Sequence, residues 1–257
     1  MSASLENKST RPNPSPGYSG VEERSGPLHS FLEHASVVIF PVVFVLNLQW
    51  AGSRLYALEM LWLVALAIPL GIVLGDFISG IVHWAADTYG TEDMRLIGPS
   101  LVKPFRLHHI YPRDICTHGL VETTGNVCIL AVPVLSLCLY LMWLKPHSAW
   151  LAFSVVSFSL AAAATVATNQ FHKWAHQESP SAFACWLQRK RLVLEPQHHK
   201  RHHTQPFDVN YCITNGWLNP LLNKLKFFRR LEAAIGFFGI ETARAKDARC
   251  SQTAAPR

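Results

Sequence analysis

The stretch SAWLAFSVVSFSLAAAATVATNQFHKWAH, residues 148–176, decides the fold because an apolar run passes directly into two histidines. Residues 148–168 carry no charge and are close to the ~20 residues needed to cross ~30 Å of hydrocarbon. His172 and His176 follow at i, i+4, which places both imidazoles on one face of a helix. The stretch therefore predicts a membrane-spanning helix that continues beyond the bilayer and carries metal ligands at its end.

Three further apolar stretches have similar length, at residues 36–52, 60–82 and 126–144. The chain is 49% hydrophobic and only 16% charged over 257 residues, which is too apolar for most soluble domains. We therefore expect an all-α, multi-pass membrane bundle of about four transmembrane helices. The alternative of four buried helices in a soluble protein is disfavoured. Pro41 interrupts the first stretch, and Asn47 and Gln49 lie near its end. A re-entrant or interfacial segment therefore remains the alternative to a full span there.

Basic residues predict the orientation of this bundle. Of the 23 Lys and Arg residues, three precede the first span, four lie between the second and third spans, and 14 follow the fourth, which leaves only Arg54 and Lys145 on the other side. By the positive-inside rule, both termini and every histidine-rich segment face the cytosol. The membrane would be that of the endoplasmic reticulum in a eukaryote, or the inner membrane in a bacterium.

The chain divides into a membrane domain and two tails. Residues 1–33 are rich in Ser, Pro and Gly and predict a disordered tail, and residues 245–257 predict a flexible one. Residues 34–244 are expected to form the membrane domain, whose histidine-rich segments are 83–125 and 169–215. The six cysteines include no CxxC pair, so a disulfide framework or a zinc ribbon is not expected.

The segment before the third span offers several candidate ligands. His83 and Asp87 lie at i, i+4 where the second span ends. In the adjacent pair His108 and His109, one imidazole can bind a metal while the other binds a second metal or supports the first. His118 and Glu122 repeat the i, i+4 spacing, although Glu122 can equally be a charge at the start of a helix.

The segment after the fourth span is the richer of the two. His172 and His176 form HxxxH with Lys173 in place of the glutamate of a HExxH protease, so peptide hydrolysis is disfavoured. The run HHKRHH at 198–203 places four imidazoles within six residues. An adventitious surface histidine tract is the alternative, but such tracts seldom recur in three separate segments.

Together these segments predict a site with two metal ions, because a single zinc or facial-triad iron needs no more than three or four protein ligands. Iron is favoured because it can activate O2 beside a lipid chain, and a non-redox membrane metal transporter or sensor is the alternative. The ten histidines are the candidate catalytic residues. The candidate metal ligands are His83, Asp87, His108, His109, His118, Glu122, His172, His176, His198, His199, His202 and His203.

The exact strings resemble the plasmanylethanolamine desaturase family, which includes the Kua-type and CarF-type membrane proteins. They are DFISGIVHWAAD (76–87), PFRLHH (104–109), NQFHKWAH (169–176), HHKRHH (198–203) and YCITNGWLNP (211–220). The resemblance implies O2-dependent desaturation of the sn-1 O-alkyl chain of a plasmanyl ether phospholipid to a 1-O-alk-1'-enyl vinyl ether, which yields a plasmalogen. It also implies two iron ions and an external electron donor, either a cytochrome b5-like protein or a ferredoxin.

The chain departs from the family pattern at one place. The family pattern Glu-Thr-Asn-Gly-Asp-Asn reads Glu122-Thr-Thr-Gly125-Asn126-Val here, which puts a role for those polar side chains in doubt, though not the metal site.

The resemblance also extends to a second branch. A plant branch that desaturates the palmitoyl chain of phosphatidylglycerol shares several of the strings. The presence of His118 and of all four histidines at 198–203 favours the ether-lipid branch.

Overall fold

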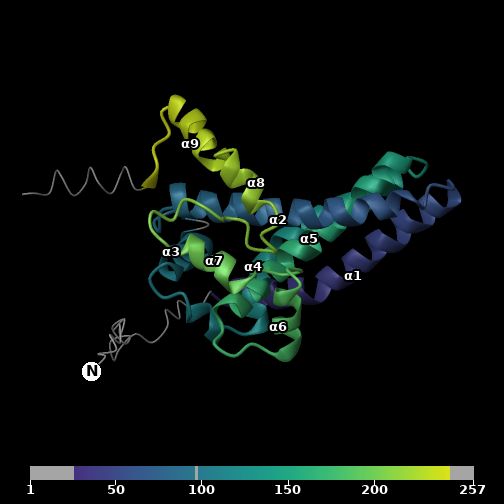
Figure 1. Ribbon diagram of the computed structural model, residues 1–257. Coiled ribbons are helices and arrows are strands. Elements are labelled where there is room, and N and C mark those ends of the chain that lie inside the picture. Colours follow the sequence, from purple (N-terminus) through teal and green to yellow (C-terminus); the bar gives the residue numbers. More distant parts are fainter. Residues whose placement is uncertain (1–25, 96–97, 244–257) are drawn as a thin grey trace, which may run out of the picture.

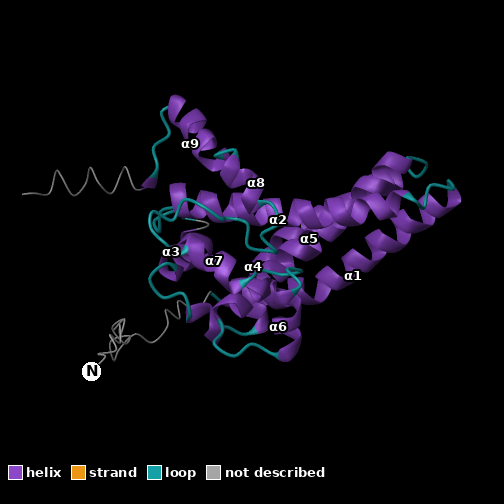
Figure 2. Ribbon diagram, viewed as in Figure 1, coloured by secondary structure: helices purple, strands orange, loops and turns teal. Residues whose placement is uncertain are grey.

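The computed structural model describes residues 26–95 and 98–243, and all regular structure in these ranges is helical (Figures 1 and 2). Four helices are long and apolar enough to cross a membrane, which confirms the predicted all-α membrane bundle. They are α1 (Pro27–Ala57), α2 (Leu63–Tyr89), α4 (Leu120–Leu144) and α5 (Ala149–His176). Because α1 begins at Pro27, residues 27–33 of the predicted tail are helical; the rest of both tails lies almost entirely outside the described residues.

The short elements gather at one end of the bundle, where α2 and α5 end (Figure 1). Between α2 and α4 lie the π-helix η1 (Gly98–Val102), α3 (Lys103–His108) and the 3-10 helix η2 (Asp114–Thr117). After α5 come α6 (Ala182–Arg189), α7 (Pro196–His202), α8 (Asn219–Lys224) and α9 (Phe227–Phe237). Helices α8 and α9 form an arm that extends away from the bundle (Figure 1).

Helix α1 runs without interruption for 31 residues and includes Pro41. Asn47, one of the polar residues that left the first span in question, is fully buried. Its amide nitrogen donates to the carbonyl oxygen of Val43 at 2.8 Å and to that of Leu135 in α4 at 3.0 Å. The side chain therefore links two helices, as buried polar side chains do in membrane bundles, and the first apolar stretch forms one long helix with no re-entrant break.

Helices α2 and α5 pack closely because small residues line their contact. A Cβ atom on Gly71 would lie 2.6 Å from Cβ of Leu160, and one on Gly75 would lie 2.5 Å from Cβ of Ala164. Small residues four apart allow the backbones of membrane helices to approach each other in this way. The close contact holds the histidine-bearing ends of the two helices side by side.

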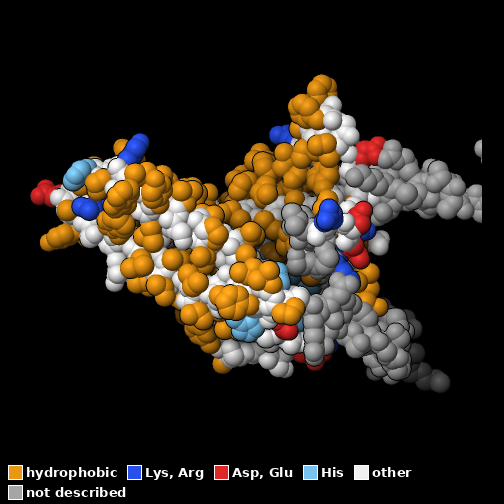
Figure 3. All heavy atoms as spheres, turned by 180° about the vertical axis from the view of Figure 1, so that it is seen from behind, with side chains coloured by type: hydrophobic (Ala, Val, Ile, Leu, Met, Phe, Trp, Pro, Cys, Tyr) orange, Lys and Arg blue, Asp and Glu red, His pale blue; other side chains and the backbone are white. Residues whose placement is uncertain are grey.

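On the face shown in Figure 3, hydrophobic side chains predominate along the long helices, and the charged side chains lie towards the two ends of the molecule. Large side chains along α1, α2 and α4 are widely exposed, among them Val38, Leu66 and Leu130. Exposed apolar surface of this extent is typical of helices that face lipid. The distribution supports a bundle that spans the membrane.

Candidate metal centre

Five histidines from three helices form the first group of candidate ligands, and their ligand nitrogens all lie within 4.8 Å of one another. One comes from α3, two come from α5, and two come from α7 and the residue that follows it. They are His108, His172, His176, His199 and His203. Helix α5 continues straight from its apolar part to His176, so the HxxxH pair points inward from one helical face.

The spacing of these nitrogens fits a metal ion. Nε2 of His199 lies 2.8 Å from Nε2 of both His172 and His176, and 3.0 Å from that of His203. A neutral imidazole nitrogen forms one hydrogen bond, so three such neighbours around one atom cannot all be hydrogen-bonded. A metal–nitrogen bond of about 2.0–2.1 Å places neighbouring ligands ~3 Å apart. The converging lone pairs therefore have the geometry of a coordination shell.

The second group is made of His83, Asp87, His109 and His202. The carboxylate Oδ2 of Asp87 lies 2.9 Å from Nε2 of His109, 3.3 Å from that of His83 and 3.5 Å from that of His202. Among the described residues, neither Nε2 of His83 nor Nε2 of His202 has a hydrogen-bond partner, although both are buried. Buried polar atoms without partners are rare in proteins, so this group also fits a cation.

Backbone carbonyl groups orient two rings of the second group. Nδ1–H of His83 donates to the carbonyl oxygen of Tyr211 at 3.1 Å, and Nδ1–H of His202 donates to that of Val209 at 2.9 Å. A ring that donates through Nδ1 keeps the Nε2 lone pair free for a metal. The segment 209–211 thus fixes both the tautomer and the orientation of these ligands.

That segment is held in turn by α2. Asp76, fully buried, accepts the backbone N–H groups of Asn215 and Gly216 on Oδ1 and that of Leu218 on Oδ2, at 2.9–3.1 Å. The hydroxyl of Ser79 accepts the N–H of Ile213 at 3.1 Å. The intramembrane carboxylate therefore positions the chain that orients His83.

The two groups are adjacent because neighbouring residues divide between them. His108 belongs to the first group and His109 to the second, while His202 belongs to the second and His203 to the first. The ring centroids of His109 and His203 are 5.2 Å apart. Since successive side chains on a helix point about 100° apart, each His-His pair contributes one ring to each group.

Burial favours the neutral form of His108, His199 and His202. It lowers the pKa of His202 to about 4, with the nearby His83 as the next cause. It also lowers the pKa values of His108 and His199 well below the usual range, with neighbouring imidazoles adding to the effect. A neutral imidazole is the form that binds a metal ion, so the ring nitrogens of these three histidines can act as ligands at neutral pH.

Three predicted ligands lie outside both groups. His118 precedes α4, its ring is partly exposed and lies 3.6 Å from Asp114, and Glu122 folds back to accept the N–H of Gly119 at 2.7 Å. The i, i+4 rule does not apply to this pair because the helix begins only at Leu120. His198 lies in the first turn of α7, on the face away from both groups, and its Nε2 accepts from the amide of Asn219 at 2.9 Å.

A family model described as the lipid desaturase domain matches residues 72–246, which include every member of both groups. No solved structure matches the chain significantly.

Curated relatives agree with the family match. The chain is 42% identical over 174 residues to the plasmanylethanolamine desaturase of Myxococcus xanthus, and the aligned region is 68% of this chain and 61% of that protein. It is 37% identical over 199 residues to plasmanylethanolamine desaturase 1 of Mus musculus, and the aligned region is 74% of this chain and 71% of that protein. It is 31% identical over 175 residues to fatty acid desaturase 4, chloroplastic, of Arabidopsis thaliana, and the aligned region is 67% of this chain and 52% of that protein. With its histidine groups inside the matched region, the chain belongs to the lipid desaturase family.

Proposed function

We propose that this protein desaturates the sn-1 O-alkyl chain of plasmanyl ether phospholipids, and so makes the vinyl ether of plasmalogens. The reaction consumes O2, two electrons and two protons, and it releases two molecules of water for each double bond. The family match and the plasmanylethanolamine desaturases among the relatives support this reaction. The observation that carries the proposal is the pair of adjacent ligand groups at one end of an apolar bundle.

The ligand set suits two iron ions. Eight imidazoles and one carboxylate make up the groups, and imidazole with a carboxylate is a donor set that iron accepts. The first group offers five nitrogens, more than the four ligands of a structural zinc site. Iron bound here would supply the activation of O2 that the removal of hydrogen from an unactivated carbon requires.

The remaining tasks fall to the residues of the chain itself. The buried rings and Asp87 exclude water from the reacting bond, since Asp87, His83 and His202 have side chains no more than 3% exposed. The carbonyl groups of Val209 and Tyr211 hold two rings in place, so that the centre does not reorganise during turnover. Apolar helices on either side accommodate the alkyl chain.

The orientation and the donor follow from the same proposal. The two ligand groups lie on the cytosolic side, together with the basic segments, in the endoplasmic reticulum or bacterial inner membrane. A cytochrome b5-like protein or a ferredoxin supplies the electrons, because the described chain carries no haem, flavin or iron–sulfur motif of its own.

Expression in a plasmalogen-free host, followed by lipid mass spectrometry, tests the proposal. We expect vinyl ether lipids to appear with the wild-type chain and to be absent with His176→Ala, which removes a ligand of the first group. A new double bond in a phospholipid acyl chain would instead assign the chain to the activity named for its Arabidopsis relatives. Metal flux across vesicles without any change in lipids would contradict both and indicate a transporter.

A further inference from the structure

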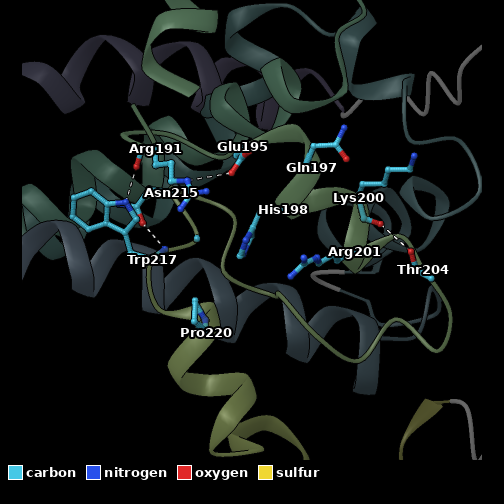
Figure 4. Close-up of a pocket in the computed structure, with 11 residues that line it drawn as sticks. Arg191, Glu195, Gln197, His198, Lys200, Arg201, Thr204, Asn215, Trp217 and Pro220 are labelled. Carbon is cyan, nitrogen blue, oxygen red and sulfur yellow. Dashed lines mark hydrogen bonds and ion pairs between the residues drawn. The ribbon is translucent and has the colours of Figure 1, made fainter. Parts of the chain in front are cut away.

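Helix α7 has two faces with different chemistry. His199 and His202 are at most 1% exposed and point into the two ligand groups. On the other face, Lys200 and Arg201 are exposed and border an open hollow of about 740 Å³ (Figure 4). The hollow is lined by residues of α7, of the chain before it and of the 215–220 segment. One helix therefore separates this hollow from the candidate metal centre.

The hollow is basic. Arg191, Lys200 and Arg201 line it, with Glu195 as its acidic residue. Arg191 lies 3.5 Å from Glu195, whereas neither Lys200 nor Arg201 forms an ion pair within the described part of the chain. In Figure 4, Arg201 reaches towards His198, while Lys200 extends away from it. Two unpaired cations on an exposed helix face favour an anionic partner.

We propose that this basic face of α7 is the docking surface for an acidic one-electron carrier protein. The inference rests on the proposed function, in which two electrons must arrive from outside for each O2 and each double bond. The carrier delivers these electrons one at a time and is oxidised in two single-electron steps. O2 takes up the two electrons, two protons and two hydrogen atoms of the alkyl chain, and two water molecules form.

The position of the hollow distinguishes a carrier from the phosphate of the lipid substrate. A helix with its side chains is about 10–12 Å across, so electrons need cross only α7 to reach the ligands on its far face. The backbone there runs directly from His198, beside the hollow, to the ligand His199. A substrate phosphate in the hollow would place the nearby alkyl carbons behind α7, away from both groups.

The charge-reversal variant Lys200→Glu/Arg201→Glu tests the surface, with Lys224→Glu/Arg230→Glu as the matched control. The two control residues are also exposed, and their substitution changes the charge by the same amount, but they lie on α8 and α9 outside the hollow. The probes are a soluble acidic cytochrome b5-type haem protein and an acidic ferredoxin, each titrated onto the purified protein in nanodiscs. Binding is measured by fluorescence anisotropy with both metal-loaded and metal-free protein.

We expect at least one probe to bind the wild type and the control, with affinity falling steeply as salt rises. The reversal should weaken that binding by at least about tenfold, as expected for an interface that depends on charge. Turnover driven by the carrier should fall in parallel. Turnover driven by a small chemical reductant should stay within about twofold of the wild type, since the ligands are unchanged.

Each other result overturns the inference in a recognisable way. Unchanged affinity for both probes places docking elsewhere. Loss of turnover with the chemical reductant and a raised KM for lipid would make the hollow a substrate site. Loss of bound metal in the variant would show that its charges maintain the ligand face of α7. If the wild type makes no vinyl ether with any reductant, the proposed function is wrong. The binding measurements with the carrier proteins then decide by themselves whether the basic face of α7 is a docking surface.

Discussion

The ligand rings depend on partners that lie outside the coordination shell. His83 and His202 each use Nδ1–H to bind a backbone carbonyl, and this directs Nε2 towards Asp87. In the first group, five imidazoles face one another with no carboxylate among them. The two ligand groups therefore differ in charge, because only the second contains an anion.

Replacement of single histidines should separate ligands from bystanders. His203→Ala removes a nitrogen 3.0 Å from that of His199, so we expect vinyl ether formation to fall by at least about 100-fold. His118→Ala changes a ring that lies outside both groups and should leave product formation near the wild-type level. Lipid mass spectrometry of the same host measures both variants. Equal loss in the two would place His118 in the metal centre and contradict the assignment.

At the scale of elements, the i, i+4 spacing predicted some shared sites on continuous helices, but not on α7, where His202 belongs to the second group and His198 to neither. It brought together His83 with Asp87 on α2 and His172 with His176 on α5. It did not do so for His118 and Glu122, because no helix connects them. The carbonyl groups of Val209 and Tyr211 have no side-chain pattern to reveal them, although the string YCITNGWLNP drew attention to the segment.

Asp76 should control the second metal position through the 211–218 segment. In Asp76→Asn, the new side-chain NH2 group faces backbone N–H donors in place of a carboxylate oxygen. At least one buried N–H therefore loses its acceptor, which lowers the free energy of unfolding by about 1–3 kcal/mol. We expect a lower unfolding temperature and partial loss of metal from the purified protein. Asp114→Asn removes the same charge from a partly exposed carboxylate and serves as the control. Identical metal content and stability in all three proteins would rule out this role.

The contact between α2 and α5 makes a matched pair of glycine substitutions informative. A Cβ on Gly75 overlaps Ala164, so Gly75→Ala should destabilise the bundle by about 1–3 kcal/mol. A Cβ on Gly52 of α1 meets nothing within 4 Å, so Gly52→Ala should be neutral or should stabilise by about 0.5–1 kcal/mol. Unfolding in mixed micelles by SDS titration compares them. Equal effects would show that helix propensity, and not helix contact, sets the result.

At the scale of the whole molecule, hydropathy alone predicted the helical bundle, because four long apolar runs have few other ways to be buried or to face lipid. The sequence also indicated two metals, from the number of imidazoles. It did not predict how the ligands divide, because the first group joins His108 to residues more than 60 positions away. Only the packing of α3 and α7 against the ends of α2 and α5 makes that division.

Metal analysis of the wild-type protein, purified in nanodiscs without added metal, tests the central claim most directly. Elemental analysis by mass spectrometry gives the number and kind of ions per chain. Two ligand groups that bind iron predict about two iron atoms per chain. One metal or none per chain, or zinc in both positions, would contradict the account.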